Sequence, residues 1–361
     1  NILENLGHHS ESSLPLYNVY KAECLALRGF MHFDILRFFC ENIVNNPSAQ
    51  GIPYVDKYDL TVSPFLTAEA AYRRIIEDLK AAEEIMQENG EYFDDADKQN
   101  NEFLKDRQIH MNLYAIQGML ARVYWMKGDL KTAAEYAQKI LDCKYFELVD
   151  KSEIEDLING VLSPKETIWG LFSANFYTNV RADLYLSGGS SSLFLKADHD
   201  DTYMADKEGT DYRYEKWFKN YSAIEASGMR CIKVLDTYEL NYATRSDARV
   251  KGVNMLRLPE LYYIITEYYL SIDNQTEAVK YFDKVLVSRG LTGYADRQGA
   301  TLTLEKVIQE RRKELVCEGQ YFFTQKRYNQ NIYEPKSGKI YQASNDIYVL
   351  PLPENETEYR Y

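Results

Sequence analysis

The feature that most constrains the fold is a helical hairpin predicted at residues 112–141. Apolar side chains recur at helical spacing on both sides of Lys127-Gly128-Asp129, which predicts one helix before this turn and another after it. Gly128 can adopt the positive φ that ends a helix. Asp129 can accept a hydrogen bond from the first turn of the next helix. Because one hairpin cannot bury its own apolar face, we expect other helices to stack on it.

The same pattern returns 145 residues later, at residues 259–289. The first copy has residues at the offsets of a tetratricopeptide repeat: Leu120, Ala121, Tyr124, Gly128, Ala133 and Ala137. The second copy matches with Ile265, Tyr269, Ala278, Phe282 and Val285, and Asp273-Asn274 form its turn. Two hairpins so far apart indicate a mainly α fold, in which tetratricopeptide-type hairpins form a scaffold. A long loop-rich insertion with few short β-strands interrupts this scaffold.

We therefore expect a single domain, 1–361, with four parts. These are a helical scaffold at 14–141 and 259–328, an irregular insertion at 142–258 and an extended tail at 329–361. Within the scaffold, we predict further helices at 14–41, from Thr67 to about Met86, and from about Thr303 to Tyr328. Residues 166–173 alternate and favour a short strand. Trp125 and Trp169 are interpreted as packing residues.

Composition excludes some classes of function. The chain has 42 basic and 55 acidic residues, a net charge of −13, so it lacks the basic surface that a nucleic-acid partner requires. No apolar run is long enough to cross a bilayer. The sequence begins with Asn1 rather than Met, which suggests a processed or truncated chain. The five cysteines show no metal-binding spacing, and we expect most to be buried free thiols.

Neither a metal site nor a catalytic pair is predicted. Asp95-Ala-Asp97-Lys-Gln99 lacks the Gly that a calcium loop needs, and Asp198-His199-Asp200-Asp201 is interpreted as a solvated cluster. Glu310 and Glu314 lie one helical turn apart. Because Arg311 and Glu318 lie close to the apolar face of the same helix, structural ion pairs are expected there rather than acid–base catalysis.

Short segments in order along the chain resemble the SusD/RagB family of nutrient-binding outer-membrane lipoproteins. The similar segments are residues 1–6, 22–37, 51–55, 72–79, 256–262, 310–319 and 350–353. Glu310-Arg311-Arg312 with Glu318-Gly319 is similar to the most recognisable helix of that family. The resemblance implies helical repeats that support a loop-rich remainder.

The resemblance also implies a cellular setting. It implies a surface-exposed lipoprotein of the outer membrane, with its signal peptide removed and an N-terminal lipid anchor absent from this chain. It implies a role in polysaccharide utilisation, with an oligosaccharide ligand that is delivered to a SusC-like TonB-dependent transporter.

We accordingly expect a non-enzymatic, cell-surface glycan-binding protein without cofactors, in which sugar rings stack on aromatic side chains. The sequence has 31 Tyr, whose flat ring and hydroxyl suit such ligands, and many lie in the irregular insertion. The residues predicted to contact ligand are the aromatic Tyr177, Tyr185, Tyr203, Trp217 and Tyr221, with Asn179, Arg181 and Asp183 as polar neighbours.

Three alternatives remain open from the sequence. One is a peptide-uptake subunit of the same fold, for which the negative surface would favour cationic or neutral peptides. The second is an intracellular tetratricopeptide scaffold protein. The third is a helical glycan hydrolase, for which the sequence offers no suitable carboxylate pair.

Overall fold

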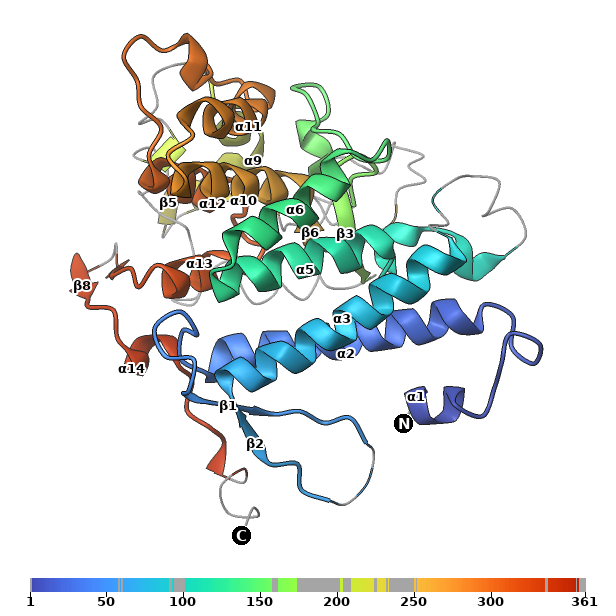
Figure 1. Ribbon diagram of the computed structural model, residues 1–361. Helices are drawn as coiled ribbons and strands as arrows, with labels where there is room; N and C mark the ends of the chain where they lie inside the picture. The colour runs from blue at the N-terminus through green and yellow to red at the C-terminus, as the bar shows by residue number, and fades with distance from the viewer. Residues whose placement is uncertain are drawn as a thin grey trace.

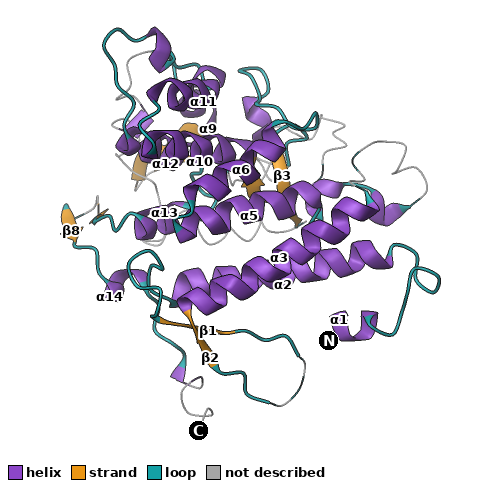
Figure 2. Cartoon of the chain, in the orientation of Figure 1, coloured by secondary structure: helices purple, strands orange, loops and turns teal. Residues whose placement is uncertain are grey.

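The computed structural model confirms a mainly helical chain with short strands (Figure 2). The residues that the structure describes are 2–57, 59, 61–90, 93, 101–157, 162–173, 202–203, 209–223, 226–231, 233, 250, 252–334, 337–354 and 356. Among the helices of this described part, none is both long and apolar enough to cross a lipid bilayer.

The helices of the scaffold pack in successive pairs (Figure 1). The pairs are α2 (Tyr17–Phe39) with α3 (Ala68–Asn89), α5 (Leu113–Lys127) with α6 (Leu130–Leu141), and α10 (Leu258–Ser271) with α11 (Gln275–Ser288). Helix α3 packs on α5, and α10 packs on α5 and α6, so the α5–α6 pair lies between the other two. The predicted stacking of distant hairpins is therefore confirmed.

Both predicted turns have the expected geometry. Gly128 has φ 88° and ends α5, and the Asp129 side chain accepts a hydrogen bond from Thr132 N at 3.1 Å. In the second hairpin Asp273 has φ 57°, and the Asn274 side chain accepts from Glu277 N at 3.1 Å. These caps satisfy backbone N–H groups that the helix itself leaves unpaired.

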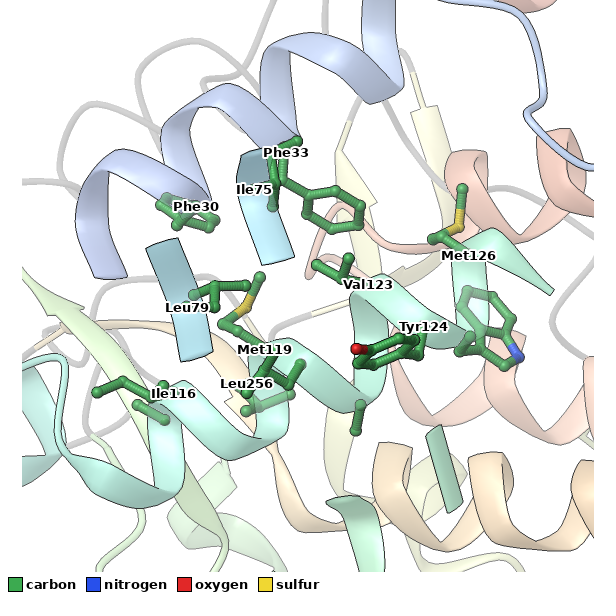
Figure 3. Packing of buried hydrophobic residues seen from close by; sticks show 14 of the residues in the cluster. Phe30, Phe33, Ile75, Leu79, Ile116, Met119, Val123, Tyr124, Met126 and Leu256 are labelled. Carbon is green, nitrogen blue, oxygen red and sulfur yellow. The ribbon is translucent and has the colours of Figure 1, made fainter. Parts of the chain in front are cut away.

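The core is centred on α5, in which every residue from Leu113 to Met126 is buried. Figure 3 shows side chains of α2, α3 and α5 meeting there, among them Phe33, Ile75 and Val123. A helix buried all round must be apolar on every side, which explains why its sequence lacks a polar face.

Trp125 and Trp169 are each 1% exposed, as expected of packing residues. Two guanidinium groups lie close to the Trp125 ring, with Arg311 4.3 Å and Arg327 4.6 Å from its centroid. Its Nε1 donates to Glu267 Oε2 at 2.5 Å. This indole therefore joins α5 to α10 and to the C-terminal helices.

The helix predicted from Thr303 to Tyr328 is broken, and this expectation was wrong. The structure has α12 (Leu304–Glu314) and α13 (Tyr321–Arg327), with a turn between them. In the turn Cys317 has φ 62° and Gly319 has φ 71°, and left-handed residues end a right-handed helix.

The remaining elements are short. The strands are β1 (Gln50–Pro53) with β2 (Phe65–Thr67), β3 (Thr167–Phe172) with β6 (Gly252–Arg257), β4 (Phe218–Ala223) with β5 (Ala226–Cys231), and β7 (Ile332–Glu334) with β8 (Lys339–Tyr341), all antiparallel. The short helices are α1 (Ile2–Leu6), α9 (Tyr212–Trp217), α14 (Asn345–Tyr348) and the 3-10 turns Glu102–Leu104, Arg107–Ile109, Ile154–Leu157 and Tyr294–Asp296. The tail is thus not uniformly extended as predicted, since it contains a hairpin and a helical turn.

Candidate functional site

The irregular insertion leaves the scaffold through a two-stranded stem, formed by β3 and β6. The strands are antiparallel, with Leu171 opposite Val253 and Phe172 opposite Gly252. At the scaffold end, Ile168 and Trp169 are buried in the main core. The stem therefore places both ends of the segment 173–251 side by side, and this segment contains every residue predicted to contact ligand.

The structure anchors the stem by a close approach to α5. A Cβ added at Gly118 would lie 2.2 Å from Leu256 Cδ2, so the absence of a side chain at this glycine lets the Leu256 side chain of β6 lie directly against α5. The stem thus packs on α5, which is buried from Leu113 to Met126. A rigid base of this kind suits loops that bind ligand.

Five of the predicted site residues lie outside the described residues. They are Tyr177, Asn179, Arg181, Asp183 and Tyr185. For these residues the assignment stays a prediction. The two acidic segments at 95–99 and 198–201 also lie outside the described residues. Within the described part of the chain, no group of His, Cys, Asp or Glu side chains is arranged to hold a metal ion.

The other three predicted residues lie on or beside the β4–β5 hairpin. Trp217 is fully buried, and its Nε1 donates to Ile154 O at 3.4 Å. Tyr203 is 4% exposed, and its hydroxyl donates to Lys313 O at 2.7 Å. Tyr221 lies in β4 opposite Gly228. Trp217 and Tyr203 therefore pack inside the protein and offer no ring face to a ligand, because their environment is the small core that also contains Phe218.

One exposed aromatic residue was missed by the sequence analysis. Phe172 is 61% exposed at the outer end of β3, and its neighbour Leu171 is 41% exposed. The residue opposite Phe172 is Gly252, which has no side chain to cover the ring. Phe172 lies at the end of a predicted strand, directly before the Tyr-rich segment, and this position is the feature of the sequence that could have identified it as a ligand-contact candidate.

A buried network of charges joins the insertion to the scaffold. At its centre Glu314 of α12 pairs with Arg257 at 2.8 Å, with Arg289 at 2.9 Å and with Arg213 at 3.2 Å. Arg257 belongs to the stem and Arg213 to α9, whereas Arg289 follows α11. One carboxylate therefore fixes the stem and the outer helix of the insertion to the last scaffold pair.

A second carboxylate and further cations complete the network. Glu166, just before β3, pairs with Arg289 at 2.8 Å and with Arg257 at 3.0 Å. The other members are Asp211, Lys233, Glu310, Lys313 and Glu318. Together the network has five acidic and five basic side chains, so the buried charge is balanced.

The surrounding cations explain why Glu314 stays ionised although it is buried. Burial by itself would raise the pKa of Glu314, but Arg289 and Arg257 hold that pKa well below its usual value. A carboxyl group in this state cannot supply a proton near neutral pH. Glu314 therefore has a structural role, and Glu310 pairs with Arg213 at 2.7 Å in the same network, so the ion pairs expected on this helix are present.

A family model for the SusD family matches residues 176–360 of this chain, which is more than half of its length. The chain belongs to the SusD family. SusD-family proteins are non-catalytic binding proteins, which agrees with the structural role of the carboxylates. No curated protein matches the chain.

Solved structures share the fold over almost the whole chain. A SusD superfamily protein from Bacteroides thetaiotaomicron is 20% identical, with a TM-score of 0.78 over 99% of this chain and 80% of that one. A SusD-like carbohydrate binding protein from Bacteroides vulgatus is 18% identical, with a TM-score of 0.74 over 98% and 78%. Surface glycan-binding protein A from Bacteroides uniformis is 16% identical, with a TM-score of 0.69 over 98% and 79%.

Proposed function

We propose that this SusD-family protein binds an oligosaccharide at the cell surface and passes it to a SusC-like TonB-dependent transporter of the outer membrane. The observation that carries the proposal is the β3–β6 stem, which is anchored in the buried core at one end and leads at its exposed outer end to the Tyr-rich segment 173–251. Similar folds in proteins described as carbohydrate-binding or glycan-binding support the choice of ligand.

The proposed site lies at the outer end of the stem. Its aromatic platform consists of Tyr177, Tyr185 and the exposed Phe172, and a sugar ring stacks on a flat aromatic face. Asn179, Arg181 and Asp183 supply donors and acceptors for sugar hydroxyls.

Isothermal titration with a panel of soluble oligosaccharides tests the proposal. We expect Phe172→Ala, and Tyr177→Ala with Tyr185→Ala, to weaken binding by roughly tenfold or more, because each removes a stacking face. Tyr333→Ala is the matched control, since Tyr333 is 53% exposed on the β7–β8 hairpin far along the chain from the stem. If these variants bind as the wild type does, the site lies elsewhere.

Titration with peptides beside the oligosaccharides distinguishes a peptide ligand from a glycan ligand. The net charge of −13 would favour cationic peptides over acidic ones. A lysine-rich peptide that binds while every oligosaccharide fails would support peptide uptake instead.

We further propose that the transporter docks on the outer side of α2, and that an N-terminal lipid anchor holds the protein in the outer membrane. The exposed residues of α2 are Met31, Ile35 and Phe38, all apolar. They are four and three residues apart, so they lie on one side of the helix. Phe38 also packs against Phe323 of α13, with ring centroids 4.8 Å apart, so Met31 and Ile35 are the residues of this side that a protein partner would cover.

A further inference from the structure

Two cysteines that are far apart in sequence meet between the insertion and the scaffold. Cys231 ends β5, and Cys317 lies in the turn between α12 and α13. Their sulfur atoms are 3.8 Å apart. We propose that Cys231 and Cys317 are the site of a disulfide bond that joins the β4–β5 hairpin to the scaffold.

The two segments are held in place by contacts other than the thiols. Lys233, two residues after Cys231, donates from Nζ to Glu314 O at 2.9 Å and pairs with Glu318, the residue after Cys317. The Lys233 ammonium also lies 4.2 Å from the centroid of the Trp217 ring. Buried contacts on the same two segments therefore keep the sulfur atoms facing each other.

Formation of the bond requires the two sulfur atoms to move closer together. They are 3.8 Å apart, whereas bonded sulfur atoms are about 2 Å apart. Cys317 has φ 62°, a conformation that non-glycine residues rarely adopt. The strained turn presents its thiol to Cys231, and strained residues occur where the surrounding structure needs a particular side-chain direction.

The two cysteines differ in exposure and in pKa, as expected if one thiol attacks an oxidant and the other then attacks the resulting mixed disulfide. Cys317 is exposed, whereas Cys231 is 1% exposed. The hydrogen bond between the thiols lowers the pKa of Cys317, with Lys233 acting in the same direction. The same hydrogen bond and burial raise the pKa of Cys231. Cys317 is therefore the thiol that meets an oxidant first.

The reaction with a small-molecule disulfide such as oxidised glutathione is balanced. The Cys317 thiolate attacks one sulfur of the oxidised glutathione, its S–S bond breaks, and one glutathione thiolate leaves. Cys231 then loses its proton to solvent and attacks the Cys317 sulfur of the mixed disulfide, which releases the second glutathione. The two protein thiols are oxidised and one glutathione disulfide is reduced to two glutathiones.

The bond would close a loop across 86 positions of the chain, which restricts the unfolded state strongly. We therefore expect the oxidised protein to have a Tm several degrees above that of the reduced protein. The effect should be largest for unfolding of the insertion, because the bond fixes its hairpin to α12.

Incubation of the folded, purified chain in a glutathione redox buffer tests the proposal. After acid quenching and denaturation, we expect the thiol count to fall from five to three, and peptide mass spectrometry to find Cys231 linked to Cys317. Cys24→Ser is the control and should still lose two thiols. Cys317→Ser, at an exposed position, should lose none, and its Tm should not respond to the oxidant.

Five thiols remaining in the oxidised wild-type chain, or a linkage between other cysteines, would overturn the proposal. Because the wild-type chain alone decides this outcome, the result does not depend on whether a variant folds. Glycan binding plays no part in the readout, so the disulfide and the proposed function stand or fail separately.

Discussion

At the scale of single residues, buried charges account for much of the specificity of this fold. Glu260 of α10 is 1% exposed, and its carboxylate receives hydrogen bonds from Arg122 at 2.6 Å and from Arg311 at 3.3 Å. Burial by itself would raise the pKa of Glu260, but the two guanidinium groups lower it to about 2. Three helices, α5, α10 and α12, therefore meet at one ionised carboxylate.

This pKa predicts how stability depends on pH. Because the folded-state pKa is below the unfolded value of 4.5, Glu260 contributes its stability above pH 4.5 and loses it as the pH falls toward 2. The contribution is about 3 kcal/mol. We expect Glu260→Gln to flatten this part of the profile of unfolding free energy against pH.

Urea unfolding at a series of pH values measures this effect. The matched control is Glu305→Gln, since Glu305 is exposed on α12, and its profile should follow that of the wild type. At neutral pH, Glu260→Gln should also lower the free energy of unfolding by about 3–5 kcal/mol, because Arg122 and Arg311 lose their buried partner. An unchanged slope between pH 4.5 and 2 would contradict the prediction.

The partners of these charges could not be predicted from the sequence. The position of Arg311 and Glu318 near an apolar face indicated that each needed an ion pair, and the structure confirms this. Their partners, however, lie 51 residues away for Arg311 and 61 residues away for Glu318 with Arg257. Only the stacking of helices brings such groups together, and the spacing of residues within one helix does not predict how that helix stacks on others.

At the scale of elements, the hairpins were predictable because their signals are local. The apolar spacing, Gly128 and the capping residues Asp129 and Asn274 all act within one or two helical turns. The break between α12 and α13 was missed for the converse reason. Cys317 is not a residue type that favours positive φ, and Gly319, which is, lies five residues beyond Glu314, the last residue of α12.

Gly118 allows a test of how closely the stem packs on α5. Alanine there would put a Cβ 2.2 Å from Leu256 Cδ2, and we expect Gly118→Ala to lower the free energy of unfolding by about 1–3 kcal/mol. Gly29→Ala in α2 is the comparison, since its Cβ would lie 3.2 Å from Leu79 Cγ and 3.3 Å from the backbone oxygen of Ile75. The higher helix propensity of alanine should offset these longer contacts.

Thermal and urea unfolding of both variants would measure the difference. Equal stability of the two variants would mean that β6 can move away from α5 at little cost. In that case the stem would not be the rigid base that the proposed binding site requires.

At the scale of the whole molecule, the scaffold was predictable but the site was only partly so. Aromatic content pointed to the insertion, yet it could not separate ring faces that are exposed from those that are buried. Trp217 and Phe172 illustrate the difference, since the Trp is fully buried and the Phe is 61% exposed. Burial depends on the small core around the β4–β5 hairpin, which assembles from segments far apart in sequence.

Docking of the proposed transporter also belongs to the scale of the whole molecule, because a protein partner binds a surface and not a single residue. The outer side of α2 is the candidate, since α1 packs against this helix and the N-terminal end of the chain lies beside it (Figure 1). Met31 is 54% exposed and Ile35 is 49% exposed, so substitution there should leave the core intact. Both side chains would be removed from water by a docked protein, which favours association.

Charged residues at these two positions would oppose docking, because a carboxylate buried in an apolar interface has no partner. We therefore expect the double variant Met31→Asp with Ile35→Asp to co-purify less with the transporter from detergent-solubilised outer membranes. The expected reduction is tenfold or more, roughly the loss expected from one buried unpaired charge. Ile272→Asp with Val287→Asp is the matched control, since these residues are 51% and 59% exposed on the last scaffold pair. Glycan titration and thermal unfolding of both double variants verify that the fold and the ligand site persist. Equal recovery of transporter with both double variants would place the docking surface elsewhere. That result would not bear on the oligosaccharide site, which the glycan titration tests independently.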